Sequence, residues 1–196
     1  MTRGPRFSRR RLVSVIVALT CVAVSAAGLR LSETAGTDHE LIRGRVGETA
    51  SINEGLVTVD DVRVGTALKS NDQIRDRTNG MFVVVHVDAE ATGPDKLSLQ
   101  SAALLADGDL SYGTYDALAG VSAETGFAVS TDVTFEVDPA RIEDLTLELY
   151  ETEFISGYQQ RLRIHLGITA GNADRWRAAA KDQGLTPVDS TTRAIP

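Results

Sequence analysis

The chain has 196 residues, with 27 acidic against 20 basic side chains and a net charge of −7. All the acidic residues follow position 29, so the rest of the chain carries 15 basic against 27 acidic side chains, a net charge of −12. Such an acidic body excludes nonspecific binding to nucleic acid or to an anionic bilayer. The single cysteine, Cys21, excludes an intramolecular disulfide, so the fold must be stabilised by apolar burial.

A basic cluster and an apolar run open the chain. Five arginines precede residue 12, among them Arg9, Arg10 and Arg11, and residues 12–29 contain no charge. The rule that positive charge stays in the cytoplasm places the later residues outside the cell. The length of the run lies between the roughly 20 residues of a spanning helix and the roughly 7 to 15 of a signal-peptide core. We predict a single-pass membrane anchor, with secretion after signal-peptide cleavage as the alternative.

Composition and periodicity divide the chain into consecutive segments. These are a basic cytoplasmic segment (1–11), a transmembrane anchor or signal-peptide core (12–29), a flexible tether (30–40), an immunoglobulin-like β-sandwich (41–170), a C-terminal helix (171–186) and a loose tail (187–196). The helical pattern itself covers 173–183, with Asn172 as the expected N-cap and Gly184 just past the end. Trp176 lies on the inner stripe, so we expect it to pin the helix to the sandwich.

The predicted sandwich shows a period of two in its apolar residues, which is typical of strands with one buried face. The pattern is clearest over 127–137, and it recurs over 145–149 and 162–166. Residues 81–87 are apolar at nearly every position. This predicts a central strand that is covered on both faces.

Breaks in the alternation predict bulges and turns. The phase changes at Asp60 and Asp61, which indicates a β-bulge. The dipeptide Asp107-Gly108 predicts a hairpin with a two-residue type I′ turn, and the charged residues 71–78 are expected to form a loop. Several short strands separated by such turns predict an all-β fold: an immunoglobulin-like antiparallel β-sandwich with one short C-terminal α-helix and an N-terminal transmembrane or signal helix.

Several segments resemble a bacterial domain family. Gly44–Thr49, Gly55–Val59, Gly80–Val87 and Asp132–Val137 are similar to strands and turns of the telokin-like, immunoglobulin-like extracytoplasmic domains grouped as DUF4352. The resemblance covers about residues 43–166 and implies an exported sandwich preceded by a secretion signal or membrane anchor. It implies no catalytic residues, because the family has no defined set.

The search for chemistry in the sequence yields few candidates. Asp107, Asp109 and Asp116 are the candidate ligands for calcium, the metal that oxygen-rich external loops favour, but a turn already explains the first two and no metal site is assigned. The chain contains no Gly-x-Ser-x-Gly, no Ser-x-x-Lys and no phosphate-binding glycine loop between a strand and a helix. We predict neither a cofactor nor enzymatic activity.

Loop tyrosines are the candidate interaction residues. Tyr112, Tyr115 and Tyr158 fall in or beside predicted loops, and tyrosines at one end of a sandwich can form a recognition surface. The alternative is that they cap the end of the core.

These observations predict a membrane-tethered, externally facing module that binds an envelope protein or a cell-wall component through loops or an exposed strand edge. The alternative is an accessory domain that binds a small solute or a metal ion and serves a sensor or a transporter.

Overall fold

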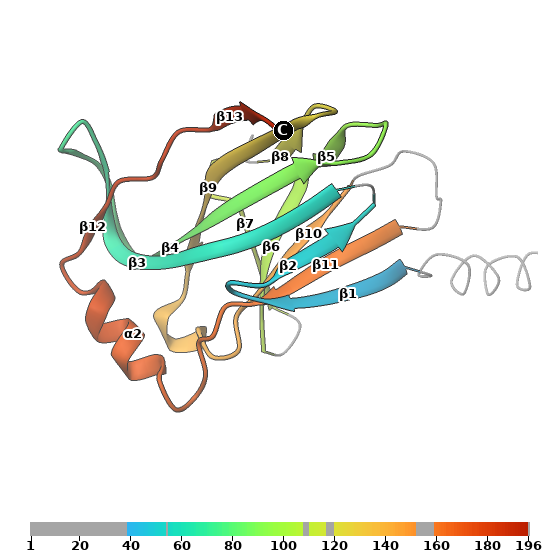
Figure 1. Cartoon of the computed structure of the whole chain (residues 1–196). Coiled ribbons are helices and arrows are strands. Elements are labelled where there is room, and N and C mark those ends of the chain that lie inside the picture. Colours follow the sequence, from blue (N-terminus) through green and yellow to red (C-terminus); the bar gives the residue numbers. More distant parts are fainter. Residues whose placement is uncertain (1–38, 54, 108–109, 117–119, 152–158, 196) are drawn as a thin grey trace, which may run out of the picture. The chain divides into compact units, whose positions relative to one another are not determined.

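A computed structural model describes residues 39–53, 55–107, 110–116, 120–151 and 159–195 (Figure 1). The predicted anchor over 12–29 and the arginines before it lie outside these residues. Within the described residues, no helix has the length and apolar character needed to cross a bilayer.

Two main sheets make up the described part of the chain. Sheet A has the order β1 (His39–Arg45), β11 (Gln159–His165), β10 (Thr146–Tyr150), β6 (Ser101–Ala106) and β7 (Leu110–Gly113). Sheet B has the order β12 (Gly184–Leu185), β3 (Gly55–Ser70), β4 (Gln73–Ala91), β9 (Phe127–Val137) and β13 (Thr191–Ala194), with β2 (Thr49–Ile52) also paired to β3. A small third sheet consists of β5 (Leu97–Leu99) and β8 (Val121–Ala123), and the helical elements are η1 (Pro139–Arg141) and α2 (Ala173–Ala180).

One apolar core lies between sheets A and B. Its fully buried side chains come from alternate positions of the strands, among them Leu104, Leu147, Leu149, Leu162 and Ile164 from sheet A and Val57, Val59, Val83, Val85, Val133 and Phe135 from sheet B. This confirms the mostly-β prediction, and most strand pairs are antiparallel as expected. Two pairs are parallel instead, β1 with β11 and β12 with β3.

Strand β4 is buried on both faces over Met81–Val85, as its apolar run predicts. Met81, Val83 and Val85 face the main core. The intervening side chains form a second apolar cluster on the outer side of sheet B, which consists of Leu68, Phe82, Val84 and Leu185 with Tyr115 packed against them.

The predicted bulge is present in β3. Its pairing with β4 shifts register between Val59 and Asp61, so Asp60 has no partner in the ladder. The shift keeps Val57, Val59 and Val64 buried on the same side of the sheet. The apolar pattern therefore located the extra residue correctly.

The loop expected over 71–78 is a strand hairpin instead. Ser70 pairs with Gln73, and the two residues between them, Asn71 and Asp72, have φ angles of 50° and 63°. Positive φ at both central residues is the signature of a type I′ turn, which Asn and Asp tolerate. The sequence pattern failed here because most of this end of the hairpin is solvent-exposed and shows no apolar alternation.

The hairpin expected at Asp107-Gly108 is confirmed, but its turn is not the expected two-residue type. Strands β6 and β7 pair with Ala106 opposite Leu110, which leaves residues 107–109 between the last paired positions. The connection is therefore one residue longer than predicted.

Helix α2 lies within the predicted helical segment but ends at Ala180, earlier than the pattern suggested. Lys181 is already extended and Asp182 has a φ of 59°, so the backbone turns away before Gln183. Trp176 is half-buried and packs against the core, as expected. The side chain of Asn172 does not cap the helix; it bonds Thr169 and Gly167 and so closes the preceding turn.

The tail expected to be loose is ordered over its described length. Residues 184–195, here called the C-terminal strap, run from β12 at the edge of β3 to β13, which pairs with β9 (Figure 1). Between these strands the Val188 amide donates to Asp132 Oδ2 at 2.6 Å, and Arg63 Nη1 donates to the Thr186 carbonyl at 3.3 Å. The strap shows no alternating apolar pattern, so its sequence did not predict strands. Its conformation is fixed by contacts with residues that are distant in sequence.

Asp132 is the centre of these contacts. Its side chain is fully buried, accepts from Arg63 and from the Val188 amide, and has Oδ1 2.8 Å from His86 Nδ1. Three partners satisfy the carboxylate, which offsets the cost of removing its charge from water. The buried carboxylate on the outer face of sheet B is thus fully paired.

We predict that Asp132→Asn lowers the free energy of unfolding by about 2–3 kcal/mol, because a charge-assisted, buried acceptor is lost while Arg63 stays in place. Urea denaturation of the full-length chain measures this, and amide exchange at Val188 should become faster. The control is Asp61→Asn, which also contacts Arg63 but has a side chain that is 58% exposed. Equal stability of the two variants would contradict the role assigned to Asp132.

A second prediction concerns pH. Burial raises the pKa of Asp88 above 3.8, and so does the hydrogen bond that its protonated carboxyl donates to neighbouring Asp60. The folded state therefore holds this proton more tightly than the unfolded chain, so the stability it contributes is full below 3.8 and is lost as pH rises through the folded pKa. Asp88→Asn should unfold at a higher temperature than the parent at pH 7, and the gain should vanish near pH 3. Thermal unfolding across pH checks this, with exposed Asp95→Asn as the control; a gain independent of pH would contradict it.

Candidate functional site

The outer face of sheet A carries a group of basic side chains from the edge strand β1 and its neighbour β11. On β11, Leu162 and Ile164 point into the core, and on β1 Ile42 packs against the same core. Because side chains alternate along a strand, the intervening residues point outward. We call these residues the cationic face: Arg43, Arg45, Arg161, Arg163 and His165.

The parallel pairing of β1 with β11 fixes how these residues meet. In this register Arg43 lies directly opposite Arg163, and Arg45 lies opposite His165. Like charges directly opposite each other in a sheet destabilise it, by about 0.2–1 kcal/mol per pair. The fold therefore retains an arginine pair that its own stability does not favour.

One buried acid partly neutralises this face. Glu148 on β10 is only 5% exposed and accepts from Arg163 Nε at 2.8 Å and from Arg161 Nη1 at 3.4 Å. Arg161 also stacks over the Tyr150 ring, with its guanidinium carbon 4.5 Å from the ring centroid. Arg161 is thus held in place, whereas the terminal nitrogens of Arg163 make no hydrogen bond to any described residue.

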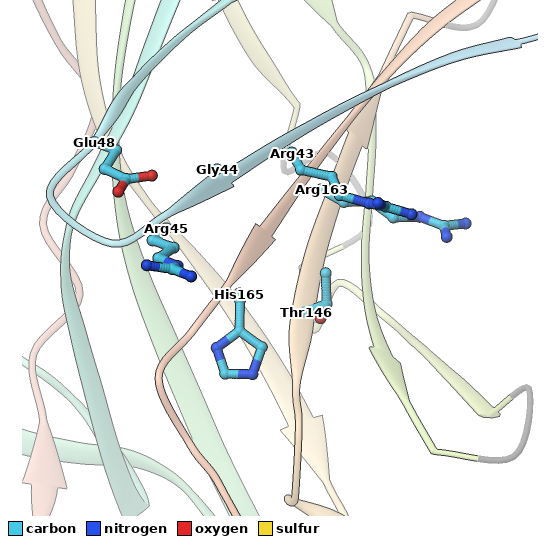
Figure 2. A pocket seen from close by; sticks show the side chains of 7 residues that line it. All are labelled: Arg43, Gly44, Arg45, Glu48, Thr146, Arg163 and His165. Carbon is cyan, nitrogen blue, oxygen red and sulfur yellow. The ribbon is translucent and has the colours of Figure 1, made fainter.

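An open pocket of about 730 Å³ lies against the cationic face (Figure 2). Its lining consists of Arg43, Gly44, Arg45, Glu48, Thr146, Arg163 and His165. Both arginines of β1 are exposed and make no hydrogen bond through their side chains and no ion pair with any described residue. Figure 2 shows Arg43 and Arg163 extending in the same direction, while Arg45 lies nearer to His165.

His165 presents a defined hydrogen-bonding pattern. The Gly167 amide donates to its Nδ1 at 3.0 Å, and its Nε2 lies 3.6 Å from Asp144 Oδ1. Nδ1 is thus engaged by the backbone of the protein itself, and Nε2 faces the carboxylate of Asp144. The guanidinium groups are the permanent cations of this pocket.

A second pocket, of about 440 Å³, adjoins the first. Its lining consists of Leu105, Ala106, Asp107, Leu110, Asp144, Thr146 and Arg163, so the two pockets share Thr146 and Arg163. The second pocket adds two acids to the shared arginine: Asp107 after β6 and Asp144 before β10, the latter beside His165. An anion is therefore attracted to the first pocket more than to the second.

The chemistry available here is anion binding. Guanidinium groups are permanently charged, and their planar fork of N–H donors matches the oxygens of carboxylates and phosphates. Two unpaired guanidinium groups beside a third provide donors that the protein itself does not satisfy.

The predicted interaction tyrosines lie apart from this face. Tyr112 is half-buried and packs against the main core. Tyr115 lies on the outer side of sheet B, where its ring meets Phe82 edge-on at 5.1 Å between centroids and its hydroxyl donates to Asp76. The structure therefore does not bring these two tyrosines together, and Tyr158 lies outside the described residues.

The candidate calcium ligands are not gathered either. Asp107 lines the second pocket, and Asp116 forms an ion pair with Arg75 at 3.4 Å. Asp109 lies outside the described residues, among which no group of three or more histidine, cysteine or acidic side chains is arranged to hold a metal ion.

Sequence reasoning missed the cationic face although half of its signal was visible. The alternation of Arg161, Arg163 and His165 with leucine and isoleucine marks an outward basic row, and Arg43 and Arg45 form a second one. What could not be read was that the two rows, more than a hundred positions apart, belong to neighbouring strands.

Comparisons with known proteins do not assign a function. No protein-family model and no curated protein matches the chain. Among solved structures it is similar to the yjhA protein of Bacillus subtilis, with 17% identity and a TM-score of 0.44, over 63% of this chain and 98% of that one. It is also similar to an uncharacterized β-sandwich protein of Clostridium difficile 630, with 10% identity and a TM-score of 0.42, over 65% and 96% of the two chains. A third structure is ycdA of Bacillus subtilis subsp. subtilis str. 168, described as a "putative lipoprotein", with 20% identity, a TM-score of 0.42, and coverage of 67% and 41%.

The arginine pair leads to a prediction about stability. Arg43→Gln should raise the free energy of unfolding by about 0.5 kcal/mol at low ionic strength, because it removes the like charge opposite Arg163. Added salt should reduce the gain by screening. Urea denaturation measures both effects, and Arg43→Lys, which keeps the charge, is the control. A loss of stability in Arg43→Gln, or an equal gain in the lysine variant, would show that the repulsion is not felt.

Proposed function

We propose that the chain is a non-enzymatic, membrane-tethered module of the extracytoplasmic, immunoglobulin-like type, and that its cationic face binds anionic groups of an envelope component. The observation that carries this proposal is the pair of unpaired guanidinium groups, Arg43 and Arg45, beside Arg163 in one open pocket. Their donors are exposed, charged and without partners among the described residues.

The charge of the rest of the chain supports selective binding. Beyond residue 29 the net charge is −12, so a polyanion is repelled by most of the surface and attracted by this one face. Repulsion elsewhere on the molecule is a means of discriminating between surfaces and between ligands. The acidic composition opposes nonspecific anion binding, but it does not oppose specific binding at a local basic patch.

The proposed extracytoplasmic location of the domain is inferred from the sequence. The arginines at 9–11 and the apolar run 12–29 favour an anchor with the later residues outside. The resemblance of residues 43–166 to DUF4352 domains favours the same location. Strand β1 begins at His39, so its arginines follow closely in sequence on the predicted tether.

A small-solute binding domain is the second candidate. The pocket of about 730 Å³ falls within the range of small-molecule sites, and its lining mixes basic, acidic and hydroxyl groups. A small anion that binds the folded state should raise the unfolding temperature with its concentration. A polymer ligand differs in gaining affinity with chain length.

We predict that the double variant Arg43→Gln, Arg45→Gln binds short-chain polyphosphate at least about tenfold more weakly than the parent, because two charge-assisted contacts are lost. Titration calorimetry of the full-length chain in detergent micelles, at several salt concentrations, measures this. Parental binding should weaken steeply with salt, and neutral dextran should not bind.

The charge-matched control for this experiment is the double variant Arg75→Gln, Arg193→Gln. Both side chains are exposed and paired with acids elsewhere on the surface, to Asp116 and Glu90. This control should bind like the parent. An equal loss in both double variants would mean that only net charge matters, and the proposed function would then fail.

A further inference from the structure

We infer that the cationic face binds a linear phosphodiester polymer rather than a single anion, with two successive phosphates bound along β1. This inference rests on the proposed function, and it names the ligand class of the same site. The polymer is one whose phosphates are joined by a short polyol unit.

The separation of the two arginines of β1 favours two bound anions. Arg43 and Arg45 are two residues apart on the same side of one strand, which separates their Cα atoms by about 7 Å. A lone phosphate cannot sit at both positions with good hydrogen-bond geometry unless both side chains bend toward one point. Figure 2 shows the opposite: Arg43 extends alongside Arg163, whereas Arg45 lies nearer to His165. The face therefore offers two anion positions.

The two positions differ in composition. Arg43 and Arg163 lie opposite each other on adjacent strands and together form the first position. Arg45 forms the second, with His165 opposite it and the carboxylate of Glu48 in the same pocket lining. The first position has two guanidinium groups, and the hydrogen bond from Arg163 to Glu148 partly neutralises their positive charge. The first position should thus bind one phosphate unaided, and the second should add affinity only when a linked phosphate is already held nearby.

The charges around the site set the direction of the ligand. Two acids border the second pocket: Asp107 follows β6, and Asp144 precedes β10 with its carboxylate 3.6 Å from His165 Nε2, so an anion is repelled both toward β6 and past the row of Arg45 and His165. Along the strands the basic row continues from Arg45 to Arg43 on β1. A polyanion therefore lies parallel to β1 and β11 rather than across the sheet.

The shape of the donors favours phosphate over carboxylate. Arg43 and Arg163 approach from two different strands, so their N–H groups are not confined to one plane. A phosphodiester has two charged oxygens on a tetrahedral phosphorus, set farther apart than the two of a carboxylate, so one oxygen can face each strand. A phosphodiester with a three-carbon unit between phosphates has its charges at a spacing comparable to that of the two arginines.

The test compares glycerol 1-phosphate with a synthetic oligomer of glycerol phosphate, by titration calorimetry of the full-length chain in detergent micelles. The oligomer should bind at least about tenfold more tightly per molecule, because the second phosphate binds as part of an already tethered ligand. Arg45→Gln should reduce the advantage of the oligomer over the monomer to less than about twofold. Arg43→Gln should weaken both ligands. Thermal unfolding confirms that each variant is folded.

The outcomes separate this inference from the proposed function. If the oligomer binds no more tightly than the monomer, the two-phosphate inference is overturned while anion binding stands. If a dicarboxylate of matched charge spacing binds as tightly as the oligomer, the assignment to phosphodiesters is overturned. If neither phosphate ligand binds, and the polyphosphate titration is also silent, the proposed function fails together with the inference.

Discussion

The parallel pairing of β1 with β11 is the constraint on which the candidate site depends. It joins the first strand of the described chain to one more than a hundred residues later, and it sets Arg43 opposite Arg163. A slip of one residue would turn the inward row of β11 toward solvent and the arginines toward the core. Burying unpaired guanidinium groups costs far more than the repulsion between exposed ones. The apolar and basic rows therefore specify the same register, and the repulsion that remains is the lesser cost.

The two outer faces of the sandwich differ in whether their charged side chains are paired. On sheet B the C-terminal strap covers Asp132, whose side chain is fully buried and whose partners satisfy it. On sheet A, Glu148 secures Arg161 and part of Arg163, yet Arg43 and Arg45 have no partner among the described residues. A buried carboxylate that is covered and fully paired has a structural role. Exposed charges of one sign, held together against their own repulsion, are better explained by a ligand from outside the chain.

Local patterns in the sequence predicted the strands well, and non-local contacts account for most of what they missed. The alternation around Asp60 located the bulge because the core-facing side of β3 is buried both before it, at Val57 and Val59, and after it, at Val64. Asn71 and Asp72 lie in an exposed hairpin without a buried face, so only their tolerance of positive φ marked the turn. The strap gave no signal because its order comes from Asp132, 56 positions away. The cationic face was hidden for the same reason: each basic row was visible, and their adjacency was not.

The mode of recognition also follows from the edges of sheet A. An exposed strand edge was one predicted route of binding, and β1 forms such an edge. Charged side chains along an edge strand discourage the addition of a further strand, and β1 carries two arginines within its seven residues. At the opposite edge, the chain after β7 pairs onward with β9, through Thr114 opposite Phe135 and the Tyr115 amide 2.7 Å from the Thr134 carbonyl. Main-chain pairing with a partner is thus opposed at one edge and already begun internally at the other. The outward side chains on the face of sheet A, by contrast, remain accessible.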